Sequence, residues 1–91
     1  MCRNIKTLHN FEPTATEDEV RAAALQYVRK VSGSAKPSKA NAAAFERAVA
    51  DVAAITSTLL GELVTTAPPR DRVVEAARAR ARAEKRFGQA A

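Results

Sequence analysis

Apolar residues recur at helical spacing in three stretches of the chain, and this pattern predicts three helices. The first covers about residues 17–32. Thr16 stands before it as an N-cap, and Glu19, three residues later, completes a capping-box pattern. Gly33 stands where a residue in the left-handed conformation would end the helix. Capping accounts for the acidic first turn without a catalytic or metal-binding role.

The second predicted helix covers about residues 39–63, after Pro37 and the candidate caps Ser38 and Asn41. It has the most regular apolar stripe in the chain, formed by Phe45, Val49, Val52, Thr56, Leu59, Leu60 and Leu63. Its opposite side carries a stripe of small residues, namely Ala43, Ala50, Ala54, Ser57 and Gly61. These small residues form either a second packing face, for a helix or another copy of the protein, or an ordinary exposed surface.

The third predicted helix covers about residues 69–87. Pro68 and Pro69 interrupt the second helix and suit the start of the third, with Thr66 as a candidate cap. The apolar face of the third helix is weak: it consists of Val73, Ala76, Ala77, Ala83 and Phe87, and Arg80 interrupts it. We therefore expect this helix to pack less firmly than the second, and a partner to supply the missing burial.

No strand pattern and no internal repeat is found, so the sequence predicts an all-α fold. We expect residues 1–91 to form one small antiparallel three-helix bundle, with a non-helical N-terminal strap over residues 1–15 pinned by Ile5, Leu8 and Phe11. Hydrophobic residues make up 46% of the chain, but 21 of them are alanines and aromatic residues are only 4%. Because alanine buries little area, a single copy has a small core, and a homo-oligomer would add to the buried area.

The single cysteine excludes an internal disulfide, and the N-terminus lacks the apolar run of a signal peptide. The longest helical pattern is too polar to span a bilayer. These features predict a cytoplasmic protein without membrane association.

The net charge of +5 is unevenly distributed along the chain. Residues 41–63 carry one base and three acids, whereas residues 64–91 carry seven bases and three acids and include the run ARARARAEKR. Such a basic segment is typical of proteins that bind phosphate backbones, but stacking aromatics and known nucleic-acid-binding motifs are missing. The candidate anion or nucleic-acid contacts are Lys36, Ser38, Lys39, Arg70, Arg72, Arg78, Arg82 and Arg86.

Cys2 and His9 are the only cysteine and histidine, and both lie in the opening MCRNIKTLHN. On an extended segment they stand roughly 20 Å apart, too far for a thiolate–imidazole pair. One cysteine and one histidine do not complete a zinc site in a monomer, although two copies would supply each residue twice. A phosphate-binding glycine loop is also missing. We therefore predict a protein that is not an enzyme and that uses no cofactor.

Four stretches of the chain, MCRNIKTLHNFEP, RAAALQYVRKVSG, KPSKAN and TTAPPRDR, resemble a small bacterial family known as domain of unknown function 2277. The family has no assigned activity. The resemblance implies a stand-alone domain whose functional surface lies among the strap, the KPSKAN loop and the PPRDR segment. The predicted function is a non-enzymatic interaction module that binds an unknown protein partner or a second copy of itself. The alternative is a nucleic-acid or polyanion binder that uses the basic C-terminal helix and the 36–39 lysine loop.

Overall fold

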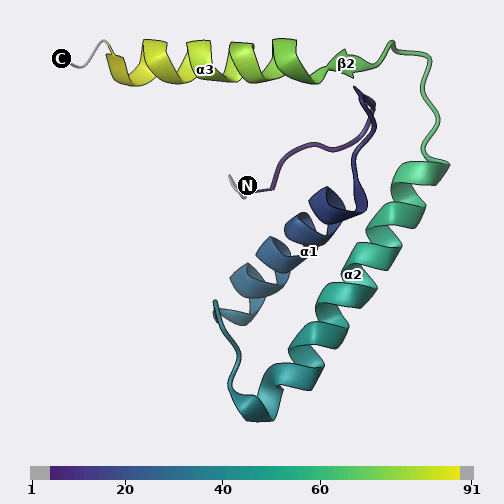
Figure 1. Cartoon of the computed structure of the whole chain (residues 1–91), viewed down its shortest axis with the longest axis vertical. Helices are drawn as coiled ribbons and strands as arrows, with labels where there is room; N and C mark the ends of the chain where they lie inside the picture. The colour runs from purple at the N-terminus through teal and green to yellow at the C-terminus, as the bar shows by residue number, and fades with distance from the viewer. Residues whose placement is uncertain (1–4, 89–91) are drawn as a thin grey trace.

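Helices dominate the computed structural model, which describes residues 5–88 (Figure 1). In chain order the elements are strand β1 (Phe11–Glu12), helix α1 (Glu17–Ser32), the short 3₁₀ helix η1 (Lys39–Asn41), helix α2 (Ala42–Glu62), strand β2 (Arg70–Asp71) and helix α3 (Arg72–Gly88). The described part of the chain is mostly helical, which agrees broadly with the predicted all-α fold. The two short strands form a parallel pair that the sequence did not predict.

The ends of α1 are set by local chemistry. The Thr16 hydroxyl accepts a hydrogen bond from the backbone N–H of Glu19, and the Glu19 carboxylate accepts one from the backbone N–H of Thr16 at 3.0 Å. This is the predicted capping box. At the other end Gly33 adopts φ 69°, where a glycine has no Cβ to clash.

Helices α1 and α2 run antiparallel and form a hairpin that contains the core (Figure 1). Ala24, Val28 and Val49 are buried where the two helices meet, and Val20 is buried nearer the start of α1. Partly buried Leu25, Phe45, Ala48, Val52 and Ala53 surround this cluster. The core is small because the contact face of α1 is built from valine and alanine.

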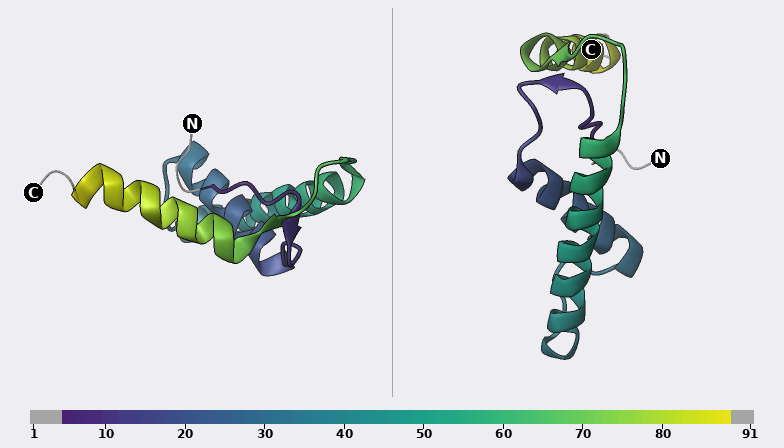
Figure 2. Two further views of the ribbon diagram at one scale, coloured as in Figure 1. Left: turned by 90° about the horizontal axis from the view of Figure 1, so that it is seen from above. Right: turned by 90° about the vertical axis from the view of Figure 1, so that its right-hand side faces the viewer.

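Helix α3 lies across the open end of the hairpin and does not pack along α1 or α2 (Figures 1 and 2). The predicted three-helix bundle is therefore not confirmed. The radius of gyration is 16.2 Å, whereas a compact chain of this length has one of about 12 Å. The reason is chemical: alanines and arginines alternate through the middle of α3, so the helix has no continuous apolar stripe to bury against the hairpin.

The helix starts also differ from the prediction. The α2 region opens with a 3₁₀ turn at Lys39, and neither Ser38 nor Asn41 caps it through its side chain. Helix α3 begins at Arg72 rather than near Pro69, because Arg70 and Asp71 are paired with the strap as β2. Within the part of the chain that the structure describes, no helix combines the length and apolarity needed to cross a bilayer.

Candidate interaction surface

Two segments far apart in the sequence hold α3 in place: the strap around β1 and the linker that follows α2. Phe11 pairs with Arg70 and Glu12 with Asp71, and the Arg70 backbone N–H donates to the Asn10 carbonyl at 2.8 Å. Asn10 has φ 63°, a left-handed conformation that asparagine tolerates. Its side-chain amide donates to the carbonyls of Ala67 and Pro68 at 3.3 and 3.2 Å. The strap and the linker are thus joined by backbone and side-chain bonds together.

Arg72, the first residue of α3, extends this connection to α1. Its Nε donates to the Pro13 carbonyl at 2.6 Å, and its two Nη atoms donate to the two carboxylate oxygens of Glu19 at 2.7 and 2.9 Å. This is the bidentate geometry in which arginine binds a carboxylate most strongly. The guanidinium groups of Arg70 and Arg72 also lie 5.7 and 5.8 Å from the centre of the Phe11 ring, within cation–π range. We call the set Asn10–Pro13, Glu19 and Ala67–Arg72 the clamp.

Glu19 belongs both to the α1 capping box and to the clamp. Hydrogen bonding to the Arg72 guanidinium, followed by bonding to the Thr16 backbone, lowers the pKa of Glu19 from 4.5 to about 2. The same bond raises the pKa of Arg72. The carboxylate therefore stays charged throughout the neutral range. The same carboxylate therefore caps the start of α1 and binds Arg72 at the start of α3.

Asp71 sets the direction in which α3 leaves the clamp. Its Oδ1 accepts hydrogen bonds from the backbone N–H groups of Val73 and Val74 at 2.8 and 3.0 Å, which makes it the N-cap of the helix. Thr66, the cap predicted from the sequence, does not fill this role. One side of α3 then passes over the strap, where Lys6, Leu8 and Phe11 face Ala76, Ala79 and Arg82 across a cavity of about 490 Å³.

The other side of α3 is open to solvent. Among residues 72–86, whose burial the structure describes, none is buried, and only Arg72 and Glu75 are even half-buried. Val73 is 76% exposed and Val74 is 45% exposed. The hairpin has exposed apolar residues as well, chiefly Ile55 on α2 at 70%. Apolar surface on two elements is thus left uncovered, and such patches typically mark interaction sites.

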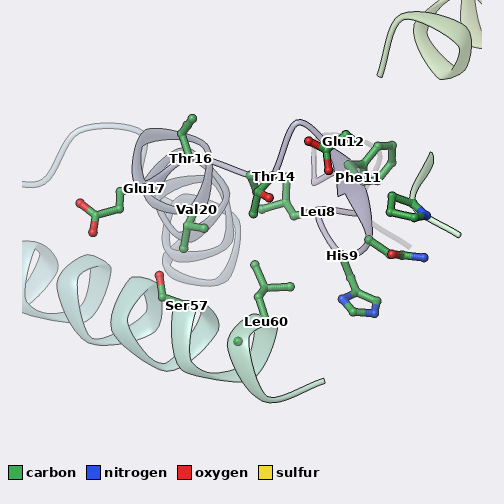
Figure 3. Close-up of a pocket in the computed structure, with 14 residues that line it drawn as sticks. Leu8, His9, Phe11, Glu12, Thr14, Thr16, Glu17, Val20, Ser57 and Leu60 are labelled. Carbon is green, nitrogen blue, oxygen red and sulfur yellow. The ribbon is translucent and has the colours of Figure 1, made fainter. Parts of the chain in front are cut away.

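A second cavity, of about 480 Å³, lies between the strap, the start of α1 and the end of α2 (Figure 3). His9 lies at its edge on the side of Leu60, while Glu17 and Ser57 lie toward its other end (Figure 3). Cys2, the other residue of the alternative two-copy zinc site, lies outside the described residues. Within residues 5–88 no three metal-binding side chains form a cluster.

The candidate anion contacts fall into two separate groups. The loop that carries Lys36, Ser38 and Lys39 lies at the closed end of the hairpin, whereas α3 lies at the open end (Figure 1). Arg70 and Arg72 are engaged with Phe11, and Arg72 also with Glu19. Arg78 reaches Glu75 at 3.2 Å, yet its side chain is 64% exposed, and Arg82 and Arg86 are exposed. The two groups do not form one basic surface, and their role in binding anions stays a prediction.

The clamp is the feature that sequence reasoning missed, although all its residues except Glu19 belong to the stretches that carry the family resemblance. Asn10 to Pro13 are in MCRNIKTLHNFEP, and Ala67 to Arg72 are in TTAPPRDR. The strap and the helix start explain each stretch on its own, so neither stretch indicates the other as its partner. In the structure they meet, and their contact fixes α3.

The chain belongs to a family described as an uncharacterised conserved protein (DUF2277), whose model matches residues 1–78. The match includes the strap, the hairpin, every residue of the clamp and the first part of α3. No curated protein and no solved structure matches the chain.

Proposed function

We propose that the protein is a non-enzymatic interaction module that presents α3 to a protein partner. The observation that carries this proposal is that the clamp fixes α3 at its first residue while none of residues 73–86 is buried. A helix with so little burial lacks the packing from which most helical stability in proteins comes. A partner that covers α3 supplies that packing.

The clamp fixes the orientation of α3 before a partner binds. A helix that merely followed a loose linker would be free to reorient, and binding would then cost the entropy of ordering it. Here Arg72 and Asp71 define where α3 starts and in which direction it runs. A helix held in one orientation binds with less of this loss. The hairpin and the clamp thus hold α3 in one orientation for docking.

Site-specific photo-crosslinking in living cells tests this proposal. A photoreactive residue at Ala77 or Ala81, on the solvent side of α3, is expected to yield covalent adducts with protein. The matched control is the same residue at Ala50, an exposed alanine on α2. Protein adducts from the α3 positions, and not from the control, support the proposal. Equal yields from all three positions, or none from α3, contradict it.

The exposed bases of α3 favour a second candidate function, the binding of nucleic acid. The three residues Arg78, Arg80 and Arg82 are all exposed, on more than one side of the helix. Fluorescence anisotropy with labelled duplex DNA and single-stranded RNA at two salt concentrations tests it. Phosphate-backbone binding weakens steeply with salt because counterions are released. Absence of binding at low salt removes this candidate, whereas nucleic-acid adducts in the crosslinking experiment support it.

A further inference from the structure

The exposed surface of the chain is too large for a compact monomer of its mass. The accessible area is 7470 Å². A folded monomer of 9.7 kDa exposes about 5100 Å², so the excess is about 2300 Å² per chain. Covering this excess on two copies buries about 4600 Å², which falls in the range of roughly 2,000–5,000 Å² found for obligate homodimers. The uncovered area is therefore large enough for a stable dimer of this chain.

Helix α2 carries an acidic and apolar stripe on its solvent side. Asp51, Ile55, Leu59 and Glu62 follow at intervals of four, four and three residues, so they lie on one side of the helix. Ile55 is 70% exposed and Leu59 is 53% exposed. All told, α2 has three acidic residues and one basic residue. We call Asp51, Ile55, Leu59 and Glu62 the α2 stripe.

Helix α3 carries the complementary surface. Val73, Ala77 and Ala81 follow at intervals of four residues, with Val74 beside them, on the side away from the strap-facing Ala79. Arg78 and Arg80 flank these apolar residues and are exposed. All told, α3 has six basic and two acidic residues. We call Val73, Val74, Ala77, Arg78, Arg80 and Ala81 the α3 stripe.

The two stripes do not meet within one chain, because the clamp directs α3 across the end of the hairpin and away from the solvent side of α2 (Figure 1). From this complementarity, and on the basis of the proposed function, we infer that the partner of α3 is a second copy of the chain, whose α2 stripe receives the α3 stripe. One chain carries both halves of the contact, so a two-fold axis forms it twice. The dimer thus covers α3 and Ile55 of both copies at the same time.

Sedimentation velocity of the purified full chain from 1 to 200 μM, at physiological salt, tests this inference. The unaltered protein is expected to shift from one-chain to two-chain mass over this range. Two double variants then reverse one stripe each: Asp51→Lys with Glu62→Lys, and Arg78→Glu with Arg80→Glu. Each variant alone places like charges at both contacts, and its dimer dissociation constant is expected to rise at least tenfold.

An equimolar mixture of the two variants provides the decisive comparison. In the mixed dimer the reversed α2 stripe meets the reversed α3 stripe, and the unaltered α2 stripe meets the unaltered α3 stripe. We expect the mixed dimer to form within threefold of the original affinity. The matched control is Glu46→Lys, an exposed charge reversal nine residues before Ile55 and so on the opposite side of α2, which is expected to dimerise normally. Circular dichroism checks that every variant keeps its helices.

The possible results test the dimer and the proposed function independently. A one-chain mass at 200 μM overturns the inference, while protein adducts from α3 in cells would still support an interaction module with another partner. A dimer that tolerates both charge reversals, or a mixture that does not restore affinity, overturns the pairing of the stripes and leaves self-association standing. Dimerisation that is lost in both variants and restored in the mixture supports it.

Discussion

The pKa of Glu19 reports directly on the clamp. The structure places it at about 2, compared with an ordinary 4.5, because the Arg72 guanidinium binds both carboxylate oxygens. Replacing Arg72 by Gln removes the cation and leaves the bond from the Thr16 backbone N–H. We therefore expect the pKa of Glu19 to rise toward 4.5 in Arg72→Gln. Arg70→Gln removes a cation that also faces Phe11 but makes no bond to Glu19, so it serves as the matched control.

The sign of the pH dependence follows from this shift. A carboxylate whose pKa is lowered by folding stabilises the folded state at pH values above its unfolded pKa. That contribution is fully present above pH 4.5 and is lost as the pH falls through about 2. Carbon-13 NMR of the Glu19 carboxyl group as a function of pH measures the midpoint. A midpoint near 4.5 in the unaltered protein, or equal midpoints in Arg72→Gln and the unaltered protein, would refute the clamp.

Three further predictions concern the hairpin and the start of α3. Val49→Ala is expected to lower the free energy of unfolding by about 1–3 kcal/mol, because the side chain is 2% exposed between the helices. Urea unfolding at low protein concentration measures this, and exposed Ile55→Ala should change it by less than about 0.5 kcal/mol. Gly33→Ala should cost about 1–2 kcal/mol in the same assay because of its positive φ, and a neutral effect would contradict the left-handed cap. Asp71→Ala should destabilise the start of α3 by about 0.5–2 kcal/mol, because Val73 loses the acceptor of its backbone N–H. Amide exchange at Val73 should then be faster in the variant than in the unaltered protein, with amides of α1 as the internal control. Unchanged exchange at Val73 would rule out the cap.

The features that the sequence predicted correctly are those decided by neighbouring residues. Thr16 and Glu19 cap α1 through bonds that span three residues, and Gly33 ends it by its own conformation. Likewise Phe45, Val49 and Val52 of the predicted α2 stripe pack at the core, because residues three and four apart share one side of a helix. Leu59 and Leu63 of the same stripe are exposed, so the stripe is buried only in its first part. Such signals do not depend on the rest of the fold, so the pattern alone identifies them.

The clamp depends on contacts between residues more than fifty positions apart, and local patterns carry no trace of them. Glu19 is fully explained by capping, so nothing in its surroundings points to Arg72. Arg72 in turn looks like part of a basic segment. Strands of two residues are also too short to show the alternation that reveals a strand.

The position of α3 relative to the hairpin is the part of the fold that the sequence pattern did not predict. The weak apolar face around Arg80 correctly indicated a helix with little to bury. The expectation of a bundle assumed that all three helices share one core. In the structure, pairing of Arg70 and Asp71 with the strap directs α3 away from that core before the helix begins.

Small-angle X-ray scattering of the dilute monomer tests most directly the central claim that the clamp holds α3 away from the hairpin. The sample concentration is lowered until the scattering mass equals one chain. We expect a radius of gyration near the 16.2 Å of the structure, increased slightly by hydration. A value of about 12 Å, which is that of a compact chain of this length, would mean that α3 folds back into a three-helix bundle and would contradict the account.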